Sequence, residues 1–331
     1  GRSAKTICEI LKGILGKGGF DVTVAYSGKE GSKILEDQSF DVITLDLHMA
    51  EQDGIAWYKK QKIKHLTTPV VVVSDSTPEK AGDVLGALEH GISDYIEKTI
   101  IRQNPKFFVS KLKNFIKSSH APHTHNEDFL ASLKIAGADI ILIGASTGGT
   151  EALTALLKNM PSYTPPICIV QHISPNFAPA FSKRLAKASN LTLGGMRNGE
   201  ALQPGHIYMA QESQHIKLSD GDGRPIINIS TRDPVNGHRP SVDVLFKSAS
   251  KMTDTRFASF LLTGMGRDGA EGMRDLHILK HMTLAQDEKS CVVYGMPKEA
   301  VDMQAVQFLG DLSQLRQQLD AIIRASVMKA A

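Results

Sequence analysis

The sequence predicts an α/β protein with two doubly wound parallel-sheet domains in series. The length of 331 residues exceeds that of one typical domain. Short apolar runs alternate with stretches of helical spacing in both halves, which is the pattern of a parallel sheet covered by helices. A polar stretch without periodicity separates the halves. We therefore predict a first domain at residues 1–117, a linker at 118–137 and a second domain at 138–331.

The composition is that of an ordinary globular protein, with 41% hydrophobic and 22% charged residues. No apolar run approaches about 18 residues, and the start lacks a signal-peptide pattern, so we expect a cytoplasmic protein without membrane insertion. A net charge of +3 is too mild to indicate a nucleic-acid partner. Cys8, Cys168 and Cys291 stand singly, which disfavours a disulfide framework and a zinc site.

The first domain alternates strand and helix after an opening helix pattern that runs from Ile7 to Leu15. The expected strands are at 20–26, 42–47, 69–74 and 94–97, and the expected helices are at 28–35, 55–66 and 78–90. Three of these strands end in a polar residue, namely Asp46, Ser74 and Lys98. Because parallel strands end at one edge of the sheet, these side chains should converge there. A carboxylate, a hydroxyl and a lysine together suit phosphoryl chemistry.

The second domain opens with a strand at 138–143, a helix at 149–159, a strand at 167–172 and a helix at 177–188. Short strands at 206–210, 215–218 and 226–230 follow, separated by turn sequences, and we expect them to form an antiparallel addition. Alternation then returns with expected elements at 242–250, 257–263, 270–279, 282–285, 298–303 and 315–327.

The turn after the first of these strands is the most informative stretch of the chain. Gly144-x-Ser146-x-Gly148 has the spacing of a nucleophile elbow, in which a serine oxygen projects from a tight turn at a helix start. A dinucleotide-binding loop is the alternative, but Ser146 stands where that fingerprint needs a glycine. The next strand ends in Gln171 and His172, without the acidic ribose partner. The pattern therefore favours serine chemistry over nucleotide binding.

A serine nucleophile needs a base and a group that orients the base. His172 follows the next strand, and Asp268 lies in another turn from strand to helix, so both could meet Ser146 at one sheet edge. The rival bases are His206, His215 and His238. The chain order of serine, histidine and aspartate differs from that of α/β-hydrolases, chymotrypsin and subtilisin, so another scaffold is needed.

No metal site is predicted. The histidines at 120, 123 and 125 cluster in the linker, but no carboxylate or thiol stands at ligand spacing beside them.

The first domain resembles the receiver domain of two-component response regulators through Asp46, Asp53-Gly54, Ser74 and Lys98. The resemblance implies that Asp46 accepts a phosphoryl group, that Ser74 hydrogen-bonds it and that Lys98 contacts it as a point charge. Receivers also have a first strand ending in an acidic pair that holds Mg²⁺. This chain starts at Gly1 without that strand, so Mg²⁺ is expected for phosphorylation while its acidic ligand pair is missing.

Five motifs follow one another along the second domain. They are Gly-Ala-Ser146-Thr-Gly-Gly-Thr-Glu-Ala, Gln-His172-Ile, Asn-Gly-His238-Arg-Pro-Ser-Val-Asp, Leu-Thr-Gly-Met265-Gly-x-Asp268-Gly-Ala and Gly295-Met-Pro. Together they resemble the CheB family of chemotaxis receptor methylesterases and glutamine deamidases. The resemblance implies that Ser146 is the nucleophile, His172 the base and Asp268 its orienting partner. It also implies that the backbone amide of Met265 contributes to an oxyanion hole.

The resemblance further implies hydrolysis of glutamate methyl esters, and deamidation of selected glutamines, on methyl-accepting chemoreceptors. No cofactor is expected for catalysis. A chemotaxis histidine kinase is the expected phosphoryl donor to the receiver. Two alternatives stay open, a nucleotide-binding oxidoreductase and a non-catalytic adaptor coupled to a receiver. With the first strand absent, we expect a destabilised or rearranged receiver that accepts phosphate poorly, unless the natural protein is longer.

Overall fold

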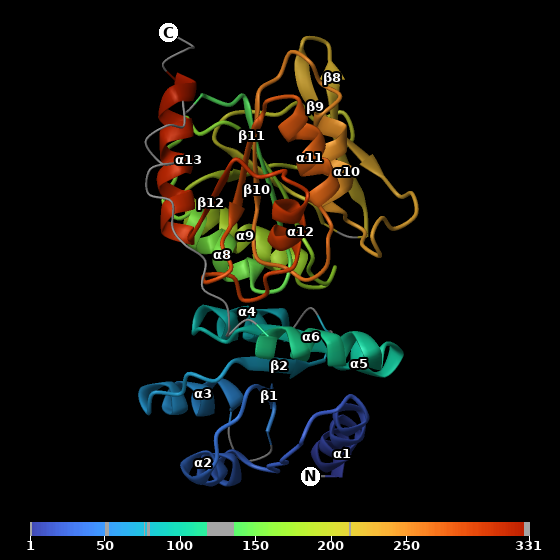
Figure 1. Ribbon diagram of the computed structural model, residues 1–331, viewed down its shortest axis with the longest axis vertical. Helices are drawn as coiled ribbons and strands as arrows, with labels where there is room; N and C mark the ends of the chain where they lie inside the picture. The colour runs from blue at the N-terminus through green and yellow to red at the C-terminus, as the bar shows by residue number, and fades with distance from the viewer. Residues whose placement is uncertain are drawn as a thin grey trace. The chain divides into compact units, whose positions relative to one another are not determined.

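The computed structural model describes residues 2–49, 53–75, 77, 80–117, 136–211 and 213–327. The chain divides into two compact units, the N-terminal unit Gly1–Ser119 and the C-terminal unit His120–Ala331 (Figure 1). The division falls within the stretch predicted as the linker. Residues 118–135, which include the clustered histidines, lie outside the described residues.

The N-terminal unit contains a parallel sheet of three strands in the order β1-β2-β3. Its elements are α1 (Arg2–Lys17), α2 (Gly28–Asp37), β1 (Ile43–Asp46), α3 (Gly54–Ile63), β2 (Val70–Ser74), α4 (Ala81–Glu89), β3 (Asp94–Glu97), α5 (Lys98–Gln103) and α6 (Pro105–Lys117). The central strand β2 is buried along its whole length, as its run of valines predicts. The predicted alternation of strands and helices is confirmed from residue 28 onwards.

The predicted strand at residues 20–26 is wrong. This segment has no regular secondary structure, although it alternates apolar and polar side chains. A strand needs a neighbour for its backbone hydrogen bonds. Within the described part of the N-terminal unit, β1 has β2 on one side and no strand on the other. Residues 20–26 therefore lack the partner that would make them a strand.

A cavity of about 230 Å³ lies between this segment and the open edge of β1. Its lining is mainly apolar and includes Leu11 of α1, Val22 and Val24 of the irregular segment, and Leu45 of β1. Trp57 also lines the cavity, and its indole Nε1 donates to the carbonyl of Gly28 at 2.7 Å. The N-terminal unit thus has a mainly apolar cavity beside its sheet, and the side chains that line it lack packing partners on that side.

The C-terminal unit contains a sheet of seven strands in the order β12-β11-β10-β4-β5-β7-β6, and every neighbouring pair is parallel. Helices α8, α9 and α13 cover one face, while α10, α11 and α12 cover the other (Figure 1). The strands of the sheet are β4 (Ile140–Ala145), β5 (Ile167–Gln171), β6 (Thr192–Leu193), β7 (His206–Met209), β10 (Phe257–Leu261), β11 (Met282–Gln286) and β12 (Phe308–Gly310). The helices are α8 (Gly149–Leu156), α9 (Ala178–Ser189), α10 (Val242–Ala249), α11 (Ala270–Ile278), α12 (Met296–Asp302) and α13 (Leu312–Val327).

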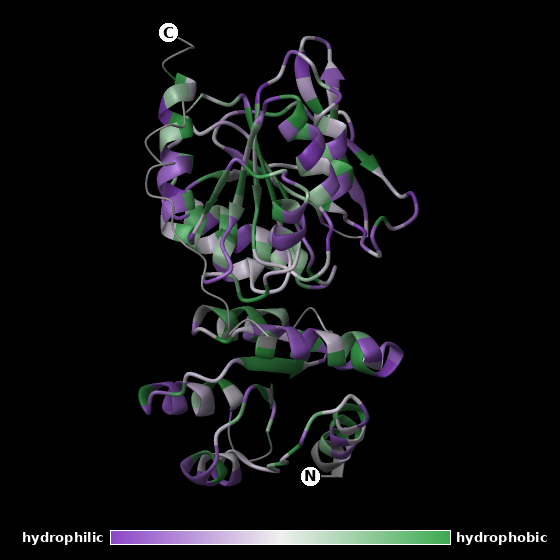
Figure 2. Ribbon diagram, viewed as in Figure 1, coloured by the Kyte–Doolittle hydropathy of each residue, from purple (hydrophilic) through white to green (hydrophobic). Residues whose placement is uncertain are grey.

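The sheet between these two helix layers is the hydrophobic core of the unit, and Figure 2 shows its central strands as strongly hydrophobic. All of β4, β5, β10 and β11 is buried. Strands covered on both faces read as continuous apolar runs, which is why the sequence predicts them well. Cys168 and Cys291 are buried free thiols, and Cys8 in the other unit is half-buried.

The predicted antiparallel addition is only partly correct. β8 (His215–Gly221) and β9 (Arg224–Ser230) do form an antiparallel hairpin. The segment predicted at 206–210 does not join them, because β7 pairs in parallel with β5 at the side of the main sheet. Its residues Ile207, Tyr208 and Met209 are all buried, as expected for a strand with covered faces.

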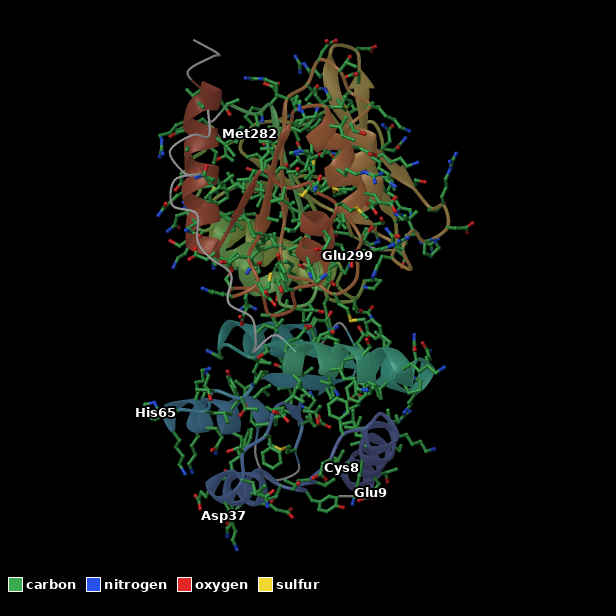
Figure 3. The ribbon with its side chains drawn as sticks, viewed as in Figure 1. Cys8, Glu9, Asp37, His65, Met282 and Glu299 are labelled. Carbon is green, nitrogen blue, oxygen red and sulfur yellow. The ribbon has the colours of Figure 1, made fainter. Side chains whose placement is uncertain are left out.

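The strands of the large sheet all point the same way, so their carboxyl ends share one edge. Met282, the first residue of β11, and Glu299, on α12, lie at different heights along this direction, with Met282 nearer the end where β11 begins (Figure 3). The candidate site lies at the edge where the strands end. No helix among the described residues is long and apolar enough to cross a bilayer.

Candidate active site

Ser146 is the first residue after β4 and lies in a tight turn that leads into α8. Gly148 in this turn has a φ of +76°, a conformation that glycine adopts without strain. The amide of Gly149 donates to the Ser146 carbonyl at 2.8 Å, and the Ser146 amide donates to Thr263 at 3.0 Å. The turn is therefore tied to the neighbouring strand end of β10, and the nucleophile elbow predicted from the sequence has its expected strand-to-helix context.

Small residues make room for the serine. A Cβ atom added to Gly264 would lie 2.7 Å from the Ser146 Cβ. One added to Gly149 would lie 2.7 Å from the Ala145 Cβ. Neither distance is compatible with normal packing, so only glycine fits at these two positions.

His172 is the first residue after β5, the strand next to β4. The register pairs Ala145 with Gln171, and the His172 amide donates to the Ala145 carbonyl at 3.0 Å. The Gln171 side chain also donates to the Ser146 carbonyl at 2.8 Å. Ser146 and His172 consequently leave the sheet side by side, as the sequence analysis predicts.

Asp268 comes from the turn between β10 and α11, and β10 pairs with β4 on the side opposite β5. Its Oδ2 lies 2.8 Å from Nε2 of His172. The side chains of His172 and Asp268 are only 8% and 1% exposed. The structure thus brings the predicted base and its predicted partner into a buried hydrogen bond.

The Asp268 carboxylate also lies at the start of α10. Its Oδ2 accepts from the Val242 amide at 2.7 Å, and its Oδ1 accepts from the Asp243 amide at 3.2 Å. The Ser241 hydroxyl and the Asn236 amide donate to Oδ1 at 2.7 and 3.0 Å. Backbone amides at a helix start favour a negative charge.

These donors decide the charge state of the buried carboxylate. Burial by itself raises the pKa of Asp268, but the hydrogen bonds from His172, Ser241 and Asn236 outweigh it and hold the pKa well below its usual range. Asp268 is therefore ionised at neutral pH, as an orienting carboxylate must be. Neither Asn236 nor the Asp268-binding role of Ser241 was predicted from the sequence, although both residues lie in the Asn-Gly-His-Arg-Pro-Ser motif.

The rival histidines have other contacts. His215 is buried, with Nε2 3.0 Å from the Asp233 carbonyl and Nδ1 accepting from the Ser241 amide. His206 lies at the start of β7, with Nδ1 2.9 Å from the Pro204 carbonyl. His238 reaches the site, but it stacks on His172 with ring centroids 3.7 Å apart and planes at 9°. Among these three, only His238 contacts a residue of the predicted triad.

Comparison with known proteins shows the family to which the chain belongs. A family model described as CheB methylesterase matches residues 141–319. A Salmonella typhimurium protein named protein-glutamate methylesterase/protein-glutamine glutaminase is 37% identical over 294 residues, covering 86% of this chain and 84% of the relative. The chain belongs to the CheB methylesterase family.

Further relatives agree with this assignment. An Escherichia coli protein of the same name is 38% identical over 294 residues, covering 86% of this chain and 84% of the relative. Among solved structures, the CheB methylesterase catalytic domain of Thermotoga maritima is 31% identical with a TM-score of 0.53, and the match covers 56% of this chain and 98% of that one. A model described as response regulator receiver domain matches residues 4–106. This CheB family member therefore joins a receiver domain to a methylesterase domain.

The turn that carries Met265 in this CheB family member is held next to Ser146. The Gly264 carbonyl accepts from the amides of Gly295 and Met296 at 3.0 and 2.9 Å, and the Gly264 amide donates to Val293. Because Gly264 packs directly against Ser146, the following Met265 peptide lies beside the nucleophile. Its contribution to an oxyanion hole stays a prediction.

Some of the residues predicted for the receiver site are in contact with one another. Nζ of Lys98 lies 2.8 Å from Asp46 and 3.6 Å from Asp75. Asp75 also pairs with Lys80 at 2.9 Å, and this hydrogen bond lowers the pKa of its carboxyl against the opposing effect of burial. Asp75 was not predicted, although it directly follows Ser74 at the end of β2.

Ser74 and Asp53 have local roles. Ser74 is buried, and its hydroxyl donates to the Asp75 carbonyl at 3.3 Å. Asp53 caps α3 by accepting from the Ile55 amide at 3.0 Å. Within the described parts of the chain, no group of three or more His, Cys, Asp or Glu side chains could hold a metal ion.

Proposed function

We propose that this enzyme hydrolyses glutamate methyl esters, and the amides of selected glutamines, on methyl-accepting chemoreceptors. The observation that carries the proposal is the buried pair of His172 and Asp268 beside Ser146, within a domain of the CheB methylesterase family. The hydrolysis uses side chains, backbone amides and water, so we propose no catalytic cofactor. A cytoplasmic location remains a prediction.

The orientation of His172 determines which nitrogen acts as the base. Nε2 faces Asp268, so in the neutral ring Nε2 carries the hydrogen and donates it to the carboxylate. Nδ1 is buried without a hydrogen-bond partner in the described part of the chain. Nδ1 is therefore the nitrogen available to take the proton of Ser146.

The reaction then follows from these positions. Ser146 Oγ attacks the side-chain carbonyl carbon of the methylated glutamate while Nδ1 of His172 takes its proton. The tetrahedral intermediate collapses to an acyl-enzyme, and the same nitrogen returns the proton to leaving methanol, or to leaving ammonia from glutamine. Water then attacks the acyl-enzyme with His172 again as the base, which releases glutamate and frees Ser146. Asp268 remains ionised and stabilises the imidazolium form of His172 in both steps.

The carbonyl oxygen of the substrate gains negative charge during each attack, and hydrogen-bond donors are needed to stabilise it. We propose the Met265 amide as one of them, because its peptide lies beside Ser146. The start of α8, at Gly149, adds the positive end of a helix dipole close to the same oxygen.

Regulation is proposed to act through Asp46, phosphorylated by a chemotaxis histidine kinase. The ion pair between Lys98 and Asp46 supports this role, since a lysine at this position would stabilise an acyl phosphate. Ser74 would hydrogen-bond the phosphoryl group after its hydroxyl leaves the Asp75 carbonyl. We propose that Mg²⁺ neutralises charge between the Asp46 carboxylate and the phosphate during the transfer.

Methanol release from membranes that carry a methylated chemoreceptor tests the proposal directly. The wild-type chain should release methanol, and Ser146→Ala should remove most of this turnover while the circular dichroism spectrum stays unchanged. A serine-directed fluorophosphonate should label the wild-type chain at Ser146. Wild-type methanol release by the alanine variant would contradict the assignment of Ser146. Saturable binding of a nicotinamide cofactor would favour the oxidoreductase alternative instead.

A further inference from the structure

We propose that His238 is a positioning residue, which holds the base His172 in its working orientation by stacking flat against the imidazole ring. This inference rests on the proposed function of Ser146 and His172, and it adds a residue that acts on the base and not on the substrate. It also gives a physical role to the Asn-Gly-His-Arg-Pro-Ser motif, which the triad itself does not explain.

The need for such a residue follows from the contacts of His172. Among the described residues, its ring makes one hydrogen bond, from Nε2 to Asp268, while Nδ1 has no partner. A single hydrogen bond leaves the ring free to rotate about the line that joins the two atoms. The second side-chain torsion of histidine has a broad energy minimum and does not fix the ring by itself. Another contact must therefore define the plane of the base.

The His238 ring supplies that contact. Its centroid lies 3.7 Å from the centroid of His172, and the two planes differ by only 9°. A parallel neighbour at van der Waals distance opposes any tilt of the base, because tilting would drive one ring edge into the other ring. The contact is between ring faces, so it carries no proton between the two histidines. His238 is thus a support for the base and not a second base.

His238 can act as a support because its own backbone is held. Val235 and His238 exchange both backbone hydrogen bonds, at 3.0 and 2.9 Å, across the two residues Asn236 and Gly237. These two residues have φ of +53° and +78°, which fits an Asn-Gly turn with two left-handed residues. The backbone therefore presents the ring from a tight, hydrogen-bonded turn.

The same turn is attached to the carboxylate that binds the base. The Asn236 amide donates to Asp268 at 3.0 Å and to Asp243 at 2.6 Å, so it bridges two buried carboxylates. The Arg239 guanidinium donates to the Thr231 carbonyl at 3.0 Å, which secures the other end of the loop. One short segment therefore positions Asp268 through Asn236 and His172 through His238.

Charge also suits this role. Burial, and then the nearby His172, lower the pKa of His238 to about 4, although Asp268 opposes the shift. The ionisable groups around it are His172 and Asp268, with Asp243 beyond them through Asn236. His238 is consequently neutral at neutral pH. A neutral aromatic face tolerates the imidazolium that forms on His172 during each attack, whereas a second cation would oppose it.

Steady-state kinetics of methanol release test the proposal with three variants. We expect His238→Ala to lower kcat by about 10- to 100-fold with KM changed less than about twofold, since the base loses its orientation but substrate contacts remain. His238→Phe keeps a flat ring and should recover most of the lost kcat. His206→Ala is the matched control. His206 also packs on a ring, that of Tyr208, but it is the first residue of β7, whereas the site lies where the strands end. It should retain wild-type kinetics.

A second measurement needs no substrate, so it separates this proposal from the proposed function. Nitrogen NMR shifts of ¹⁵N-histidine, assigned to His172 by their loss in His172→Asn, should show a protonated Nε2 and a bare Nδ1 in the wild-type chain. His238→Ala should average these two signals, and His238→Phe should keep them apart. Unchanged His172 signals in His238→Ala would overturn the proposal. So would a kcat of His238→Phe as low as that of His238→Ala.

Discussion

The hydroxyl of Ser241 donates to Oδ1 of Asp268 at 2.7 Å and at the same time accepts from the Val244 amide at 3.4 Å. Ser241 is thus both the N-cap of α10 and a ligand of the orienting carboxylate. The start of this helix and the charge of Asp268 stabilise each other, because the helix amides face the carboxylate. The stability of α10 and the turnover of the enzyme should therefore change together.

Ser241→Ala tests this coupling. Loss of the cap should destabilise the C-terminal unit by about 1 kcal/mol. It should also lower kcat several-fold, since Asp268 loses one donor. Thermal unfolding and methanol release measure the two effects. Ser248→Ala, at a serine of α10 that donates to the Leu245 carbonyl, is the control and should leave kcat unchanged. A full-length Ser241→Ala variant with lower stability but wild-type kcat would separate the two roles.

Asp268→Asn tests the orienting role. The amide nitrogen cannot accept a hydrogen bond as the carboxylate does, and the imidazolium loses its counter-charge. We expect kcat to fall by about 10⁴-fold with little change in substrate affinity. Turnover and binding to a methylated receptor should be measured separately. Preserved turnover with collapsed affinity would mean that Asp268 binds substrate or only caps a helix.

Gly264→Ala should displace Ser146, because the added methyl group would fill space that the serine occupies. The new Cβ would lie 2.7 Å from the Ser146 Cβ and would also meet the Met296 sulfur. The serine must shift away from its base, so we expect kcat to fall by about 100-fold. Gly82→Ala, in α4, introduces a Cβ with no atom within 4 Å and should not affect turnover. Equal kcat values for the two variants would show that the site tolerates the shift.

The stability of the C-terminal unit should decrease as the pH falls below 6.5, in part because of His238. Its pKa is lowered from the ordinary 6.5 to about 4, so the unfolded chain binds a proton there at higher pH than the folded chain does. The contribution of this histidine is full above pH 6.5 and is lost as the pH falls towards 4. The melting temperature of His238→Phe should depend less steeply on pH than that of the wild type between these values. Parallel curves would contradict this expectation.

The receiver should gain function when a strand is added upstream. A segment that pairs with the open edge of β1 and ends in two aspartates should fill the apolar cavity and supply acidic ligands. We expect Mg²⁺-dependent phosphorylation at Asp46 and faster methanol release. The same segment ending in two asparagines is the control, which should restore packing but not phosphorylation. Normal Mg²⁺-dependent phosphorylation of the 331-residue chain would show that the added strand is unnecessary.

The buried strands and the turns that carry Ser146, His172 and Asp268 can be predicted from the order of amino acids. Ile140 to Ile143 form a continuous apolar run, and such a run is compatible only with a covered strand or a buried helix. The small residues around Ser146 and Asp268 mark turns from strand to helix. The apolar runs and the turns depend only on residues that are close together in the chain, so their spacing in the sequence is enough to predict them.

Strand pairings and side-chain orientations arise only in the folded molecule. β7 joins the parallel sheet, and residues 20–26 fail to form a strand, because strand formation depends on which neighbour offers free backbone groups. The contact of His172 Nε2 with Asp268, and the stacking of His238 on His172, join residues more than 60 positions apart in the sequence. No local pattern encodes such a contact, since it arises only when the packed strands bring their ends to one edge.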